Sequence, residues 1–140
     1  MIAQPREAYM KRIALAVGLA LSIGLPASAD PVFALWQTEV DDGAYAHVKI
    51  DACGDKICGV FVRTFKAEGE YESENLGKMV VKNMVPKGTN HYRGTVWRPS
   101  NNKDYIGKID LKGDTLFLKG CVAGGLFCAK QTWVRLKEEG

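Results

Sequence analysis

Four cysteines are the residues with the clearest chemistry in this chain of 140 amino acids, and they stand at Cys53, Cys58, Cys121 and Cys128. The two cysteines of each neighbouring pair bracket a turn-like segment. Of the three pairings that four cysteines allow, we therefore predict two local disulfides, Cys53–Cys58 and Cys121–Cys128. The alternative is one zinc site built from all four thiolates. Spacings of C-x4-C and C-x6-C beside apolar residues differ from the short polar knuckles of structural zinc sites, so disulfides are favoured.

Residues that could perform catalysis are scarce elsewhere. The chain has only two histidines, His47 and His91, and no nucleophile, base and orienting acid can be assembled around either one from the sequence. Each is expected to be a solvated surface residue. Glycine-rich phosphate loops and the ligand spacing of zinc enzymes are missing from the sequence. We therefore predict a protein that is not an enzyme and that uses neither a cofactor nor a metal.

Acidic residues cluster in two places. Asp41 and Asp42 precede Gly43, which is typical of a turn. Glutamates occupy alternate positions from 68 to 74 in a segment, 66–78, that is poor in apolar residues. We interpret that segment as an exposed loop with a solvated acidic edge. A calcium site there is the alternative, although the spacing fits no EF-hand loop.

Aromatic and basic residues form the more informative group. Residues 97 and 98 end a strand-like segment and lead into a polar loop, and loops of this kind often carry binding residues. In a barrel such residues can line the mouth. The candidate ligand-binding residues are Trp97, Arg98, Asn101, Lys103 and Tyr105.

The segments that must position these residues are short and strand-like. Residues 44–51 alternate strictly between apolar and polar side chains, which is the pattern of a half-buried strand. Further strands are predicted within 30–39 and over 57–65, 79–85, 91–97, 105–111, 115–121 and 127–136, with turn signals between them. About eight short strands without a helical period indicate an all-β fold, an antiparallel sandwich or barrel.

The first 29 residues have the organisation of a secretory signal peptide. Lys11 and Arg12 precede the apolar run 13–25, and Ala27-Ser28-Ala29 forms a small-x-small cleavage site. The run is shorter than the ~20 residues that a membrane-spanning helix needs. We predict a signal helix over 1–29 and one mature domain over 30–140, in the periplasm or secreted, without stable membrane insertion after cleavage. An uncleaved signal anchor is the alternative, and Met10 is an alternative start.

The charge balance of the predicted mature domain argues against a nucleic-acid partner. The whole chain has 19 basic and 16 acidic residues, a net charge of +3. The first 29 residues contain three of the basic residues and one of the acidic ones, which leaves +1 for the rest. A dedicated nucleic-acid-binding domain is usually strongly basic.

Several local patterns together resemble the DUF2147 family of exported bacterial proteins. They are the segment 50–59 (IDACGDKICG), Glu74-Asn75, Trp97-Arg98-Pro99 with Lys103 and Tyr105, Gly120-Cys121 and the closing QTWVR of 131–135. The resemblance covers nearly all of the mature chain and implies a small up-and-down barrel, lipocalin-like in fold. It implies no activity, because the function of the family is undetermined. Glu74 stands where an Asp is common, and Ala34 replaces an initial Gly.

The resemblance also suggests how the barrel closes. Lipocalin-like barrels often close with an N-terminal Trp packed against a basic side chain of the last strand, and Trp36 and Arg135 occupy those relative places. Such a pair gains roughly 0.5–2 kcal/mol from the cation–π interaction. The alternative is that Trp36 and Trp133 are simply core residues.

Two hypotheses of function remain. The first is a soluble barrel that binds a small or amphipathic ligand without catalysis. The second is a structural or protein-interaction module of the cell envelope, with an envelope protein as partner and a barrel filled by side chains. The interior decides between them, since an apolar cavity of about 300 Å³ or more favours ligand binding.

Overall fold

The structure, a computed structural model, describes residues 29–137. These residues form strands β1 (Ala34–Gln37), β2 (Ala44–Cys53), β3 (Lys56–Lys66), β4 (Gly69–Tyr71), β5 (Met79–Pro86), β6 (His91–Arg98), β7 (Lys103–Lys112), β8 (Thr115–Val122) and β9 (Phe127–Leu136), with one 3-10 turn at Ala123–Gly125. The predicted signal helix lies outside the described residues. From residue 29 to residue 137, no helix is long and apolar enough to cross a membrane.

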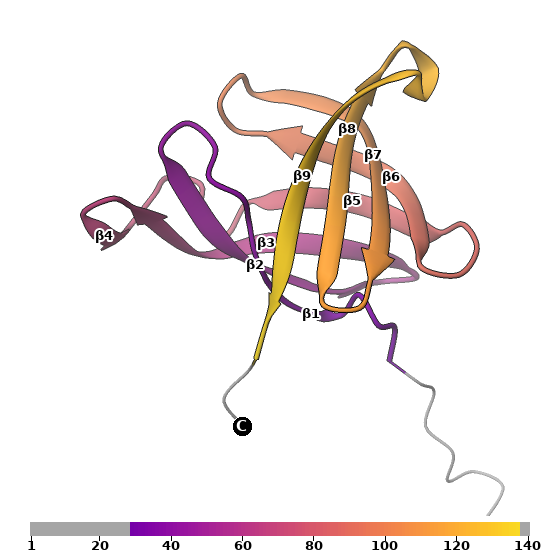
Figure 1. The fold of residues 1–140 in the computed structure, drawn as a ribbon, viewed down its shortest axis with the longest axis horizontal. Coiled ribbons are helices and arrows are strands. Elements are labelled where there is room, and N and C mark those ends of the chain that lie inside the picture. Colours follow the sequence, from indigo (N-terminus) through magenta and orange to yellow (C-terminus); the bar gives the residue numbers. More distant parts are fainter. Residues whose placement is uncertain (1–28, 138–140) are drawn as a thin grey trace, which may run out of the picture.

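The strands form a closed antiparallel barrel, as the family resemblance implies (Figure 1). β1 pairs with both β2 and β9, and β2 also pairs with β3, so the sheet returns to its own first strand. Eight of the nine strands belong to this ring. β4 pairs with β3 alone and extends to one side of it. The closure is confined to one end, because β9 pairs with β1 only over residues 134–136, while residues 127–133 of β9 pair with β8 alone.

The interpretation of 66–78 as a plain exposed loop is wrong. Residues Gly69–Tyr71 form β4, which pairs back onto the end of β3. Arg63 donates to both carboxylate oxygens of Glu70, at 2.8 and 2.5 Å, and fastens this small hairpin. The sequence does not indicate β4, because neither face of this short strand is buried in the core. It therefore lacks the alternation of apolar and polar residues from which strands are predicted.

The core fills one end of the barrel more completely than the other. The largest fully buried apolar residues of the core are Trp36, Trp133, Ile50, Met84, Ile109 and Leu116. The turns at 54–55, 87–90 and 113–114 lie at this end, which we call the closed end. The connections 38–43, 67–78, 99–102 and 123–126 lie at the opposite, open end.

A row of small residues crosses the inner face of the sheet. Gly94 on β6 lies opposite Gly107 on β7, Gly107 opposite Gly120 on β8, and Gly120 opposite Ala129 on β9. A Cβ on Gly94 would lie 2.7 Å from the carbonyl oxygens of residues 82 and 83, so β5 approaches β6 closely here. A Cβ on Gly120 would meet only side chains, the nearest at 3.2 Å. At Gly94 the missing side chain therefore allows β5 to pack closely against β6. At Gly120 it leaves space inside the barrel.

Both predicted disulfides are present. Cys53 is bonded to Cys58 across the β2–β3 turn, and Cys121 to Cys128 across the β8–β9 hairpin. The second pair joins residues that lie directly opposite each other on neighbouring strands. All four cysteines are thus paired, which leaves no thiolate for the zinc alternative.

Candidate functional site

The closed end of the barrel is sealed by Trp36 and Arg135. The two residues lie opposite each other on β1 and β9, and the Arg135 guanidinium carbon is 4.5 Å from the centre of the Trp36 ring. Trp36 is fully buried and donates its indole N–H to the Val32 carbonyl at 2.9 Å. Arg135 also donates to the Asp114 carboxylate and to the carbonyl oxygen of Pro31, at 2.9 and 3.0 Å.

The residues just before β1 complete this seal. The Asp30 carboxylate accepts a hydrogen bond from the backbone N–H of Val32 at 3.0 Å and another from the hydroxyl of Tyr92. Burial, and then the hydrogen bond to the Asp30 carboxylate, raises the pKa of Tyr92. The start of the predicted mature chain is thereby held against β6.

The open end contains a cavity of about 660 Å³. Its floor is made of apolar or small residues from six strands. The fully buried Trp133 lies at the bottom and donates its indole N–H to the Gln131 side chain at 2.9 Å. The other floor residues are Ala46, Phe61, Val80, Val96, Leu118 and Gly120. The floor is thus an apolar surface that the row of small residues leaves uncovered.

The rim of the cavity is polar. Arg98 at the end of β6 donates to the Asp41 carboxylate in the β1–β2 connection at 3.3 Å, joining two loops at the mouth. The hydrogen bond to the Asp41 carboxylate raises the pKa of Arg98. On the other side, the Lys66 ammonium lies 4.3 Å from the centre of the Tyr71 ring. The cavity therefore combines an apolar floor with a charged and hydrogen-bonding mouth.

Three of the five candidate ligand-binding residues line this cavity, namely Trp97, Arg98 and Tyr105. Asn101 does not line it, but its amide donates to the Tyr105 hydroxyl at 2.7 Å. Lys103 lies opposite Arg98 on β7 and is exposed outside the lining. The structure thus brings four of the five candidate residues together at the mouth, whereas Lys103 lies outside the cavity.

The β3–β5 connection contributes lining residues that the sequence analysis missed. Thr64 is buried, donates to the Tyr71 carbonyl at 2.6 Å and accepts from the Ser73 N–H at 3.3 Å. These bonds hold residues Tyr71, Ser73, Glu74 and Asn75 at the mouth. The resemblance pattern at Glu74-Asn75 was the only sequence signal for this part of the site.

Neither histidine lines the cavity. His47 is half-buried on the outer face, where its Nε2 lies 3.1 Å from the Gln37 side chain and its Nδ1 is buried without a hydrogen-bond partner. His47 was expected to be a solvated surface residue; it does lie on the outer face, but it is partly buried there. Burial, and then the nearby Arg63 guanidinium, lowers the pKa of His47, while Glu70 opposes this. His91 is exposed, as predicted.

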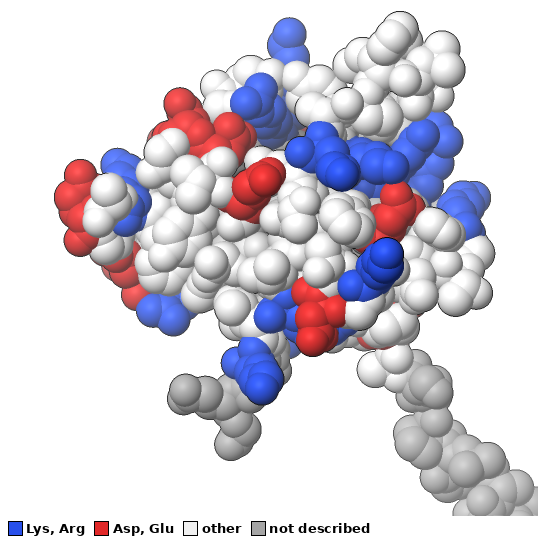
Figure 2. Space-filling model, in the orientation of Figure 1, with Lys and Arg blue, Asp and Glu red and all other residues white. Residues whose placement is uncertain are grey.

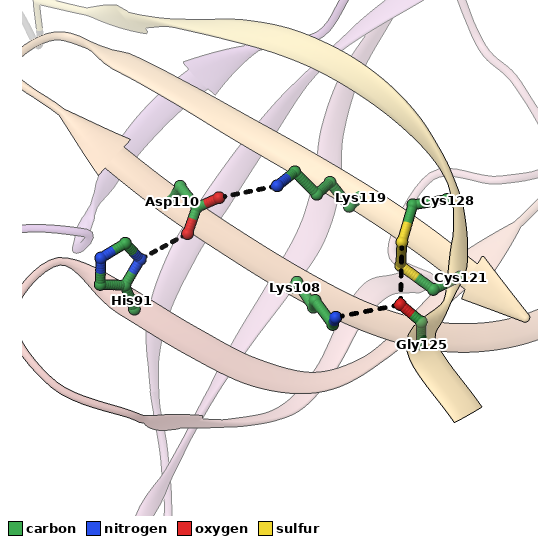
Figure 3. A network of polar contacts seen from close by, with 7 residues as sticks. All are labelled: His91, Lys108, Asp110, Lys119, Cys121, Gly125 and Cys128. Atoms are coloured by element: carbon green, nitrogen blue, oxygen red, sulfur yellow. Dashed lines mark hydrogen bonds and ion pairs between the residues drawn. A yellow bond between two sulfur atoms is a disulfide. The ribbon is translucent and has the colours of Figure 1, made fainter.

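The outer face of β6–β9 carries a network of charged side chains (Figure 3). The Asp110 carboxylate contacts His91 Nδ1 at 2.5 Å and Lys119 Nζ at 3.1 Å. Partial burial of Asp110 is outweighed by these two hydrogen bonds, which lower its pKa. Among the described residues, no three His, Cys, Asp or Glu side chains are grouped in a way that could hold a metal ion.

Comparison with known proteins supports the fold. The chain resembles the solved structure of protein HP1028 from the human pathogen Helicobacter pylori, described as belonging to the lipocalin family, with a TM-score of 0.64. The two share 12% sequence identity, and the match covers 79% of this chain and 86% of that chain. Identity this low supports the fold alone. None of the curated proteins matches the sequence.

A family model matches residues 34–135, from the first residue of β1 to the next-to-last residue of β9. The match thus includes the closing pair, both disulfides and the lining of the cavity. It agrees with the resemblance found in the sequence. The chain belongs to the DUF2147 family, whose description is "Uncharacterized protein conserved in bacteria".

Proposed function

We propose that this protein binds a small amphipathic ligand in the cavity at the open end of its barrel, without catalysis. The observation that carries this proposal is the cavity itself, because its volume of about 660 Å³ falls within the range of small-molecule sites.

The chemistry of the lining indicates the class of ligand. An apolar part of the ligand would lie on Trp133, Phe61 and Leu118, where each Å² of apolar surface buried contributes about 25 cal/mol. A polar end would remain at the mouth, near Arg98 and Tyr105. The candidate residues Asn101 and Lys103 lie outside the lining, and Asn101 acts indirectly in this proposal by orienting the Tyr105 hydroxyl.

The cavity argues against a barrel that only presents its outer surface to an envelope partner. The closed end is filled by Trp36, Met84 and their neighbours, as that hypothesis requires. The open end contains the cavity. Unfilled volume lowers the stability of a folded protein, and a bound ligand would fill it. Ligand binding explains why small residues line it.

We further propose that the protein works in the periplasm or outside the cell. Two disulfides are typical of proteins in oxidising compartments, and the family is bacterial. The signal peptide predicted from residues 1–29 would direct this export. N-terminal sequencing of the exported protein tests the cleavage, and the expected first residue is Asp30.

Native mass spectrometry tests the presence of a ligand directly. Protein purified from the envelope fraction of its own bacterium, without detergent, is expected to carry a bound mass of a few hundred daltons that is released on denaturation. Protein that is free of any bound mass, and stays so after incubation with a total lipid and metabolite extract of the same cells, would contradict the proposal.

A cavity-filling variant tests the place of binding. Ala129 lines the cavity and is exposed to it, so Ala129→Trp should fill the mouth without disturbing the core. The fluorescent probe 1-anilinonaphthalene-8-sulfonate, which has an apolar body and one polar group, should bind the wild type and bind this variant at least about tenfold more weakly.

The matched control is Val134→Trp, on the outer face of the same strand, which should bind the probe like the wild type. Equal binding by both variants would place the probe outside the cavity. In that event Leu126→Ser with Phe127→Ser would show whether the probe lies on the exposed hairpin tip instead.

A further inference from the structure

A row of four cations crosses the outer face of four neighbouring strands. Arg93 on β6 lies directly opposite Lys108 on β7, Lys108 opposite Lys119 on β8, and Lys119 opposite Lys130 on β9. We call these four residues the basic row. Like charges directly opposite each other destabilise a sheet. Their arrangement is therefore unfavourable for folding alone and indicates an anionic partner.

The charge of the basic row is only partly neutralised. Among the ion pairs of residues 29–137, the only one that includes a member of the row joins Lys119 to Asp110. Lys130 lies 5.0 Å from the centre of the Phe117 ring, which leaves its charge available. A shallow depression of about 550 Å³ adjoins the row and is lined by Lys87, His91, Tyr92, Arg93, Lys108 and Asp110. Most of the charged groups there are basic.

An exposed apolar tip stands next to the basic row. It consists of Val122, Leu126 and Phe127 at the end of the β8–β9 hairpin, with exposed fractions of 50%, 80% and 69%. The hairpin projects from the barrel (Figure 1). In Figure 2 its uncharged end lies directly above a band of Lys and Arg side chains. Such large exposed apolar residues at one convex point are costly in water.

Local contacts hold the tip and the row together. Lys108 Nζ donates to the Gly125 carbonyl oxygen at 3.2 Å, as Figure 3 shows. The place of a Cβ on Gly125 would be 3.1 Å from Lys108 Nζ and 3.8 Å from Arg93 Nη2. The Cys121–Cys128 disulfide cross-links the hairpin just below the tip. The apolar tip and the cations are thus one fixed surface.

We infer that this surface docks the protein on a membrane that contains anionic phospholipids. The tip would enter the interface of the bilayer, where aromatic and aliphatic side chains are favoured, and the basic row would contact the phosphate groups around it. A projecting tip suits a lipid surface, which yields to it, better than a rigid acidic protein. This is peripheral docking, and it differs from the membrane insertion that the sequence argues against.

The docking would also orient the cavity. The tip belongs to the connections at the open end, and Ala129, two residues after Phe127 on β9, lines the cavity. A docked barrel would therefore hold its mouth close to the lipid. The docking itself rests on the outer face and not on the proposed ligand, so either proposal can fail alone, although Lys130 of the basic row also borders the cavity.

Vesicle sedimentation with the disulfide-bonded mature chain tests the docking. The protein should sediment with vesicles of phosphatidylethanolamine and phosphatidylglycerol, and should stay in solution with vesicles of phosphatidylcholine. Binding should weaken in about 0.5 M NaCl, because salt screens exposed charges. Equal binding to both vesicles, or binding to neither, would overturn the inference. If the protein does not bind vesicles but forms dimers through the tip, the surface would be an interface with a second copy of the chain.

Paired variants test the residues. Arg93→Gln with Lys130→Gln should weaken binding about fivefold for each cation removed. The control is Lys56→Gln with Lys112→Gln, which removes the same charge at the closed end. Leu126→Ser with Phe127→Ser should also weaken binding. Its control is Val62→Ser with Val134→Ser, two exposed residues away from the tip. Control variants that lose as much vesicle binding as the test variants would contradict the assignment of the docking surface to the basic row and the tip.

A gain-of-signal variant covers the case in which a test variant does not fold. Phe127→Trp keeps an aromatic residue at the tip. The emission that it adds to that of the wild type should shift to shorter wavelength on vesicles and be quenched by brominated phosphatidylglycerol. Ala129→Trp with an unchanged binding to vesicles would separate the docking surface from the cavity. An added emission that vesicles leave unchanged in Phe127→Trp would refute insertion of the tip.

Discussion

The guanidinium of Arg135 lies over the ring of Trp36 with 4.5 Å between its central carbon and the ring centre, so the last strand caps the first. The stack does not stand alone. Arg135 also donates to Asp114 in the β7–β8 turn and to Pro31 before β1, so a single side chain ties three distant segments together. The closed end depends on this convergence because no helix covers it in the part of the chain that the structure describes.

Removal of the Trp36 ring should therefore destabilise the barrel strongly. Trp36→Ala is expected to lower the free energy of unfolding by about 3–5 kcal/mol, since it removes a fully buried aromatic residue. Arg135→Ala should cost about 1–3 kcal/mol through lost stacking and hydrogen bonds. Arg135→Lys should cost less, because charge and stem remain. Urea unfolding measures all three, and an Arg135→Ala value within about 0.5 kcal/mol of wild type would mean that Arg135 contributes little.

The features that follow from local pattern are the ones that the sequence predicts well. Apolar alternation identifies β2, because Ala46, Val48 and Ile50 face the core and the residues between them do not. Short spacing between cysteines on either side of a turn identifies both disulfides. These features need no knowledge of which strands meet across the barrel.

The cavity could not be predicted in the same way, because it depends on distant strands. Its lining combines residues of every strand from β2 to β9, which come together only in the closed sheet. Thr64 is an ordinary polar residue in the sequence, and its burial follows from the contact with Tyr71 after an unforeseen hairpin. The basic row escaped notice for the same reason, since its members are far apart along the chain.

The inner glycines should differ sharply in their tolerance of substitution. Gly94→Ala would bring a Cβ to 2.7 Å from two backbone oxygens of β5, which cannot move aside, so a loss of about 3 kcal/mol or more is expected. Gly120→Ala would meet a Val96 methyl group at 3.2 Å, facing the cavity, and should stay within about 1 kcal/mol of wild type. Thermal unfolding of both variants is the measurement. Equal losses would show that β5 does not press on β6 as described.

Each disulfide should stabilise the fold by lowering the conformational entropy of the unfolded chain. Cys121→Ser with Cys128→Ser removes a cross-link between residues separated by seven positions, for which the chain-entropy relation gives about 2.5 kcal/mol. Cys53→Ser with Cys58→Ser should cost slightly less because its loop is shorter. Urea unfolding gives these values. Peptide mapping without reduction gives the pairing, and any peptide that links Cys53 or Cys58 to Cys121 or Cys128 would contradict it.

His47 should make the protein less stable in mild acid. Its pKa is lowered in the folded state, chiefly by burial, whereas in the unfolded chain it is about 6.5. As pH falls through about 6.5, the unfolded chain takes up a proton that the folded barrel resists, so stability falls until the folded pKa is passed. His47→Gln should remove this slope between about pH 7 and pH 5. Urea midpoints across that range measure it, with His91→Gln as the control that leaves His47 in place. A slope that survives in His47→Gln would assign the acid sensitivity to another group.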